Sequence, residues 1–137
     1  MVDANLDVSD DCVTAFNQLK MDKTLKYVIF RIENQRTIVI DKAAPSSTSI
    51  NQLVTDVCES EPRFIVLDME YTNPDGLTLN KIIFIHWIPN SAKVAPKMVY
   101  ASSKENLKRK FVGIFKEVQA TDPGDLTAEG LQSSLRF

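Results

Sequence analysis

Histidine, cysteine and glycine are scarce in this chain of 137 residues, which contains one, two and four of them, respectively. No cysteines and histidines have the spacing of a metal site, and no glycine-rich phosphate loop or G-x-S-x-G motif is present. The single histidine, His86, lies in an apolar run beside Trp87, where a packed ring is more common than a catalytic one. The sequence therefore argues against an enzyme, and we expect no cofactor and no metal.

An excess of one charge and long apolar runs are also lacking. The formal net charge is −2, so we expect no nucleic-acid partner, and any binding to a polyanion would need a local basic patch. No apolar run is long enough to span a membrane, and the acidic start MVDANLDVSDD lacks the pattern of a secretory signal. Cys12 and Cys58 do not form a disulfide framework, so we expect a reducing, cytoplasmic location.

Hydrophobic periodicity predicts one domain, residues 1–137, in which helices and strands alternate. Helical spacing follows an N-cap at Ser9 in CVTAFNQLKM and recurs in INQLVTDVC, from Pro96 to Phe111, and after about Asp125. Strands are expected for LKYVIFRIE and RTIVIDK, for RFIVLDMEY and LNKIIFIHWI around the turn TNPDG, and for KEVQAT. The order αββαββαβα predicts an α/β (α+β) fold with a mixed sheet and helices on both faces.

Asp68 and Glu70 lie two residues apart in the strand expected for RFIVLDMEY, so their side chains point to the same face. Such a pair could act as a general acid and base, but no other catalytic group converges on it in the sequence. We therefore interpret the pair as a solvated strand end.

The helix expected from Pro96 to Phe111 has an unusual outer face. Its inner stripe consists of Tyr100, Ser103, Leu107 and Phe111, and its outer face of Lys97, Met98, Ala101, Lys104, Glu105, Lys108 and Arg109. The outer face carries four positive charges and one acid, whereas a helix that is only solvated usually mixes the two signs. It also exposes Met98, whose flexible thioether suits adaptable contact surfaces.

Three interpretations of this face remain open on the residues alone. It can be an ordinary solvated surface, in which Lys104 and Lys108 only aid solubility. It can bind an acidic protein partner whose hydrophobic groove accepts Met98. It can also bind an anionic lipid headgroup, although helices that bind membranes usually have a wider apolar face.

Several separated motifs resemble the actin-depolymerising factor/cofilin family. They are VTAFNQLK, KIIFIHWIPNSA, KMVYASSKENLKRK and VQATDPGDL, which follow the family's order and spacing from about Asp7 to Leu126. The resemblance implies a single ADF-homology domain, with a mixed central sheet sandwiched between two pairs of helices. It also implies a cytoplasmic, non-enzymatic monomer of the actin cytoskeleton. Such a protein binds actin monomers, preferring the ADP form, and filament sides, and promotes severing and filament disassembly.

The resemblance also implies which residues contact actin. Matching positions assign the monomer contacts to the long helix and the N-terminal segment, namely Lys97, Met98, Lys104, Glu105, Lys108, Arg109, Ala4 and Leu6. A second surface, needed only for filaments, would include Lys81, Leu79 and Arg136. Members of the family also bind phosphoinositides through the basic groups of the monomer-binding surface. A phosphoinositide- or acidic-surface-binding module with reduced actin affinity is therefore the alternative function.

The chain departs from the family pattern in both surfaces. Ala95 stands where the family commonly has a basic residue two positions before the equivalent of Lys97. Leu79 replaces a basic residue of the filament surface, and Ser133-Ser134 stand where charges are expected in the C-terminal helix. Because filament binding needs both surfaces, we expect monomer binding to be retained better than filament binding or severing. Ala4 takes the place of the family's regulatory serine, so we expect no phosphorylation switch there.

Overall fold

A six-stranded sheet runs through the molecule in the order β1-β3-β2-β4-β5-β6. The computed structural model describes residues 6–135, apart from the side chain of Tyr71. The strands are β1 (Asp7–Val8), β2 (Leu25–Glu33), β3 (Thr37–Pro45), β4 (Arg63–Thr72), β5 (Thr78–Trp87) and β6 (Lys116–Ala120). The outer pairs β1–β3 and β5–β6 are parallel and the inner pairs are antiparallel, so the sheet is mixed.

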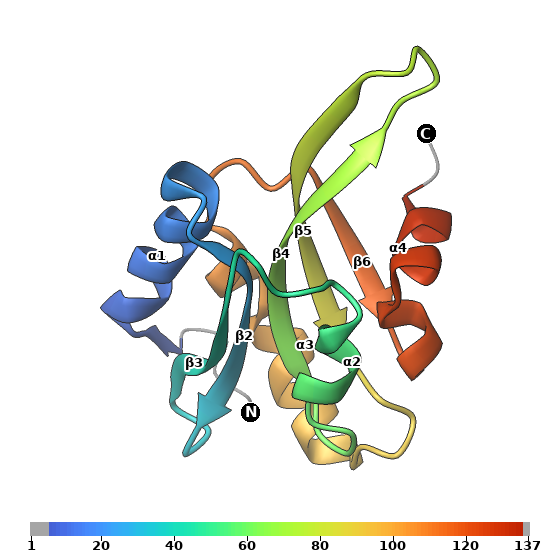
Figure 1. The fold of residues 1–137 in the computed structure, drawn as a ribbon. Helices are drawn as coiled ribbons and strands as arrows, with labels where there is room; N and C mark the ends of the chain where they lie inside the picture. Colours follow the sequence, from blue (N-terminus) through green and yellow to red (C-terminus); the bar gives the residue numbers. More distant parts are fainter. Residues whose placement is uncertain (1–5, 136–137) are drawn as a thin grey trace.

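Helices cover both faces of this sheet (Figure 1). They are α1 (Asp10–Asn17), α2 (Gln52–Asp56), α3 (Val94–Lys108) and α4 (Ala128–Ser134), with a π-helical turn η1 (Gln18–Asp22) and a 3-10 turn η2 (Pro123–Leu126). Residues of α1 and α3 belong to one core cluster, and residues of α2 and α4 to the other. The predicted mixed sheet between two pairs of helices is confirmed.

The alternation in β2 explains how one strand serves both cores. Tyr27 and Ile29 belong to the cluster under α2 and α4, whereas Val28 and Phe30 belong to the cluster under α1 and α3. The polar turn after β2 reverses the chain into β3, as predicted. Its central residues Asn34 and Gln35 have φ of 54° and 55°, the backbone conformation that the tightest hairpin turns require.

The element boundaries differ from the prediction at several places. β1 was not expected, because a strand of two residues is too short to show a period of two. The α1 pattern continues past Asn17 as η1, and α2 is shorter than the stretch INQLVTDVC. β3 extends through Pro45 into a segment expected to break the pattern.

The interpretation of Asp68 as a solvated strand end is wrong. Its side chain is buried, and its carboxylate accepts a hydrogen bond from Asn80 Nδ2 at 3.2 Å and lies 3.7 Å from Lys23 Nζ. Lys26 Nζ donates to the Asp68 backbone carbonyl at 2.8 Å. Of the two acids, Glu70 is exposed, as the interpretation required. Since Asn80 and Lys23 come from other parts of the chain, periodicity along β4 could not reveal this burial.

Candidate functional site

The inner side of α3 is fixed firmly to the sheet. Tyr100, Ser103 and Leu107 are buried, as predicted, and the Tyr100 hydroxyl accepts a hydrogen bond from the Ile32 backbone N–H at 2.9 Å. Ser103 tolerates burial because its Oγ donates to the carbonyl of Val99 at 2.7 Å. α3 therefore forms a rigid base for the side chains on its outer face.

Phe111 is buried as expected but lies beyond the end of α3, which ends at Lys108. Its ring stacks on that of Phe16 in α1, with ring centroids 4.4 Å apart and planes inclined by 8°. This contact anchors the chain that leaves α3 to the second helix on the same face of the sheet.

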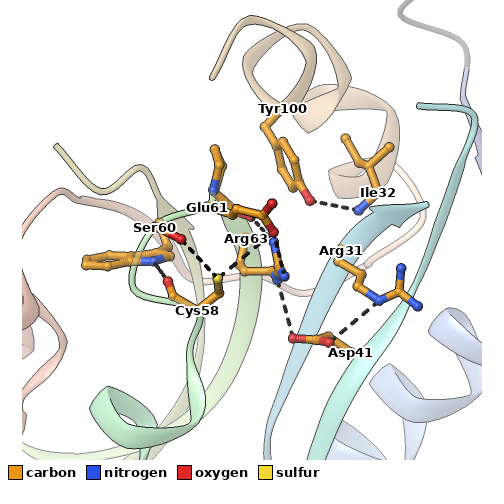
Figure 2. A network of polar contacts seen from close by, with 10 residues as sticks. Arg31, Ile32, Asp41, Cys58, Ser60, Glu61, Arg63 and Tyr100 are labelled. Carbon is orange, nitrogen blue, oxygen red and sulfur yellow. Dashed lines mark hydrogen bonds and ion pairs between the residues drawn. The ribbon is translucent and has the colours of Figure 1, made fainter. Parts of the chain in front are cut away.

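A polar network lies beside the N-terminal half of α3, where Tyr100 bonds to β2 and Arg63 joins the start of β4 to β3 (Figure 2). The buried guanidinium of Arg63 donates to Asp41 at 3.3 Å, to Glu61 at 3.3 Å and to the carbonyl of Pro62 at 2.8 Å. Beside this network lies a cavity of about 340 Å³, which Pro96, Val99 and Tyr100 of α3 line together with residues of the β2–β3 turn.

The N-terminal end of α3 presents exposed apolar side chains. The exposed fraction is 57% for Met98 and 71% for Val94, which lies one turn earlier on the same side. Lys97 stands between them in sequence and makes no ion pair or hydrogen bond through its side chain with any described residue. Sequence reasoning identified Met98 and Lys97 but missed Val94, which its spacing of four residues from Met98 could have indicated.

The C-terminal half of α3 is arranged differently, because its two lysines are already paired. Lys104 Nζ lies 2.8 Å and Lys108 Nζ 2.6 Å from the two carboxylate oxygens of Glu117 on β6. Glu105 is a further, looser partner of Lys108 at 3.7 Å. The sequence pattern of α3 contains no signal for Glu117, since it belongs to another element.

The electrostatics of this cluster agree with its geometry. Partial burial alone would raise the pKa of Glu117, but the hydrogen bonds from Lys104 and Lys108 outweigh it, and the pKa is lowered. The hydrogen bond with Glu117 in turn raises the pKa of Lys108. Glu117 and Lys108 therefore remain ionised over a wide range of pH around neutrality.

His86 lies buried on the same face of the sheet as this cluster. Its ring packs against Phe64 with centroids 5.4 Å apart, and its Nε2 has no hydrogen-bond partner among residues 6–135. Burial, and secondarily the charge of Lys104, lowers the pKa of His86 to about 4. The packed-ring interpretation of His86 is confirmed.

Of the predicted N-terminal contacts, Leu6 can be placed against α3. Its carbonyl accepts a hydrogen bond from Asn106 Nδ2, and its side chain packs against the core under α1 and α3. Ala4 lies outside the described residues. The remaining outer residue of the helix, Arg109, is exposed and follows the last residue of α3.

Two of the residues predicted for a second surface, Lys81 and Leu79, lie on the β4–β5 hairpin, which extends beyond the other strands (Figure 1). Lys81 Nζ is 4.9 Å from the centre of the Phe115 ring, a cation–π contact. Leu79 is half-buried, and Leu77 near the turn is exposed. Arg136 lies outside the described residues, whereas Ser133 and Ser134 are exposed on α4.

Fold and site together define an α+β binding protein. In the described part of the chain, no group of three or more acidic, histidine or cysteine side chains could hold a metal ion. No helix within residues 6–135 is long and apolar enough to cross a membrane. Its main candidate binding surface is α3, which is fixed to the sheet and exposes apolar side chains and a lysine at its N-terminal end.

Comparisons with known proteins identify the family. The profile of the family described as "Cofilin/tropomyosin-type actin-binding protein" matches residues 5–136. The chain therefore belongs to the cofilin/actin-depolymerising factor family, whose members bind actin and are not enzymes.

Relatives and solved structures agree over nearly the whole chain. Cofilin of Gibberella zeae is 42% identical, with 90% of this chain and 89% of the relative covered. Cofilin/actin-depolymerizing factor homolog 2 of Plasmodium falciparum is also 42% identical, with 83% and 84% covered. The crystal structure of Plasmodium berghei actin depolymerization factor 2 superposes with a TM-score of 0.86 at 36% identity, covering 97% of this chain and 98% of that one. Streptomyces griseoflavus cofilin gives 0.85 at 37% identity, with 95% and 98% covered.

Proposed function

We propose that this protein binds actin monomers through the N-terminal end of α3. The observation that carries the proposal is the exposure of Met98 beside Lys97 on a helix whose opposite side is fixed to the sheet. An apolar side chain of this kind can enter a hydrophobic groove, while the ammonium group orients it toward an acidic surface. Family membership and the names of the relatives support actin as the partner.

The remaining monomer contacts follow along the same helix. Lys104, Glu105, Lys108 and Arg109 continue the outer face, and Leu6, whose carbonyl is bound by Asn106, lies beside α3. A preference for ADP-bound actin belongs to this proposal, as does action at the actin cytoskeleton in the cytoplasm as a monomer.

Filament binding and severing form the weaker part of the proposal. The hairpin contributes Lys81, but its ammonium group lies over Phe115, and the adjacent outer positions are the apolar Leu77 and Leu79. These features support a protein that binds monomers better than filament sides and promotes disassembly mainly through monomers.

Binding of phosphoinositides or another acidic surface is the second candidate function. Lys97 and Arg109 support it, because neither forms an ion pair within the described part of the chain. The pairing of Lys104 and Lys108 with Glu117 counts against it, because two of the four cations on the outer face already have a carboxylate partner.

The deciding experiment is a titration of fluorescently labelled ADP-actin monomers. We expect the Lys97→Ala/Met98→Ala variant to lose about 2 kcal/mol or more of binding free energy, roughly a 30-fold rise in Kd, if these side chains are hot spots. Met21→Ala is the matched control, since Met21 is another exposed methionine, on η1, with 71% exposed against 57% for Met98. Equal Kd values for the double variant and wild type would contradict the proposed site. An unchanged actin signal with wild type would contradict the proposed function.

A further inference from the structure

We infer that Glu117 on β6 determines specificity by masking Lys104 and Lys108 from polyanions in general. The inference rests on the proposed function of α3 and adds to it the residue that limits binding to anionic surfaces. The masked lysines leave recognition to the apolar end of the helix, where a partner must offer a groove as well as acidic groups.

The geometry of the cluster supports masking. Each carboxylate oxygen of Glu117 accepts from one ammonium group, at 2.6 Å for Lys108 and 2.8 Å for Lys104. The side chains of Lys104, Lys108 and Glu117 are only 23%, 26% and 26% exposed. Because water and salt reach these groups only partly, the pairing is screened less than an open surface pair would be.

The sheet fixes Glu117 in this position. β6 pairs in parallel with β5, and Glu117 lies opposite Phe84, which belongs to the core under α1 and α3. The next residue, Val118, belongs to the other core. Strand alternation therefore directs Glu117 toward α3, where it meets the lysines that the helix places one turn apart.

The groups that contact this cluster do not change the balance. Lys104 and Lys108 are ion-pair partners of Glu117, the more exposed Glu105 lies 3.7 Å from Lys108, and His86 lies on the same face of the sheet in β5. Burial keeps the pKa of His86 far below neutrality, so at pH 7 this ring adds no positive charge. The middle of the outer face therefore carries two cations and two acids.

The two remaining cations of the outer face of α3 are too far apart to form one patch. Lys97 and Arg109 are twelve positions apart along the helix, which corresponds to about 18 Å. The Debye length at physiological ionic strength is about 8 Å, so the two charges act almost independently on a polyanion. Near Lys97, by contrast, Val94 and Met98 are exposed, and an apolar groove can use them.

The test compares Glu117→Gln with wild type on two ligands. The first ligand is a vesicle that contains phosphatidylserine in phosphatidylcholine, and the second is the ADP-actin monomer. One additional effective positive charge near an anionic membrane raises binding on the order of five-fold. We expect a gain of this size on the vesicles, lost at high salt. The actin Kd should change by less than about two-fold, because the anchor Met98 is untouched and Lys104 and Lys108 are secondary among the proposed actin contacts.

Two further variants show where the gain comes from. Glu105→Gln makes the same change in net charge on the more exposed partner, 68% exposed, and we expect it to produce less than half of the gain. Adding Lys104→Met and Lys108→Met to Glu117→Gln should abolish the gain, because it depends on the two released lysines. Thermal unfolding of each variant checks that the fold is intact. In the triple variant all three charged groups of the cluster are replaced by uncharged side chains, so no buried charge is left without its partner.

The outcomes separate this inference from the proposed function. Unchanged vesicle binding by Glu117→Gln, an equal gain with Glu105→Gln, or a gain that persists in the triple variant would each overturn masking. An equal gain in affinity of Glu117→Gln for vesicles and for actin would overturn the role of Glu117 in specificity. Failure of wild type to bind actin, with the vesicle gain intact, would instead refute the actin proposal and leave the masking established.

Discussion

α3 and the β4–β5 hairpin are the two surfaces on which contacts were predicted, and they differ in how the fold supports them. α3 lies along the sheet, with buried residues from Tyr100 to Leu107 and a direct hydrogen bond to β2. The hairpin projects past its neighbours, and the residues from Thr72 to Leu79 are mostly exposed (Figure 1).

This difference bears on binding. A side chain on a braced helix is already held near its bound position, so little conformational entropy remains to be lost when a partner arrives. A projecting hairpin must be held by its partner. Its main cation, Lys81, would also have to give up its contact with Phe115 to reach outward. Monomer contacts on α3 should therefore be the stronger of the two sets.

The largest expected effect tests the support itself. Leu107 is fully buried under α3, whereas Leu77 is an exposed leucine on the hairpin. We expect Leu107→Ala to lower the free energy of unfolding by about 2–5 kcal/mol, and Leu77→Ala to change it by less than about 0.5 kcal/mol. Denaturant unfolding of both variants measures the difference. Similar losses at the two positions would show that the hairpin is packed as tightly as α3.

A second, somewhat smaller effect concerns the stability of the protein at acidic pH, which depends on the buried His86 of β5. Burial lowers the pKa of His86 to about 4 from its ordinary value of 6.5, so between these pH values the unfolded chain binds a proton that the folded chain does not. Stability therefore falls as the pH drops from 6.5 toward 4, by roughly 3 kcal/mol at most.

His86→Phe separates this effect from other titrations. The variant keeps an aromatic ring against Phe64 but has nothing to protonate, so its unfolding free energy should vary much less between pH 6.5 and 4. Asp56 and Glu117, whose pKa values are lowered by their hydrogen bonds despite burial, lose their contributions only below about pH 4.5, and they do so in both proteins. Parallel pH profiles for variant and wild type would contradict this assignment.

The sequence predicts the side of α3 that meets the sheet better than the side that meets a partner. The spacing of Tyr100, Ser103 and Leu107 identified the three buried residues of α3, because a period of 3.6 residues is a property of the helix alone. Phe111 is also buried, but it lies beyond the end of the helix. The state of Lys104 and Lys108 depends on Glu117, which only the parallel pairing of β6 with β5 brings to the helix. No periodicity along α3 contains that information.

The hairpin repeats this lesson. Its two strands and the turn between them were predicted from local signals, and all three are present. The burial of Asp68, in contrast, arises from Asn80 on the partner strand and Lys23 after η1, and the contact of Lys81 with Phe115 joins β5 to the segment before β6. Contacts between elements decide which charges remain available, and these contacts require the three-dimensional structure.

The last prediction compares the two surfaces in function. If α3 is the dominant contact, the protein should bind ADP-actin monomers at least ten-fold more tightly than filament sides, a difference of about 1.4 kcal/mol. Cosedimentation with filaments over a series of salt concentrations gives the affinity for filaments, and the titration of labelled ADP-actin monomers gives the affinity for monomers. The affinity for filaments should weaken more with salt than the affinity for monomers, because filament binding by the hairpin depends on the charge of Lys81 without a strong apolar anchor.

Leu79→Lys should bring the affinity for filaments closer to that for monomers, because it adds a cation two residues from Lys81 on the same face of β5. Tight, saturating pelleting of the wild-type protein that resists salt would mean that the hairpin, although less supported by the fold, contributes as much to binding as α3.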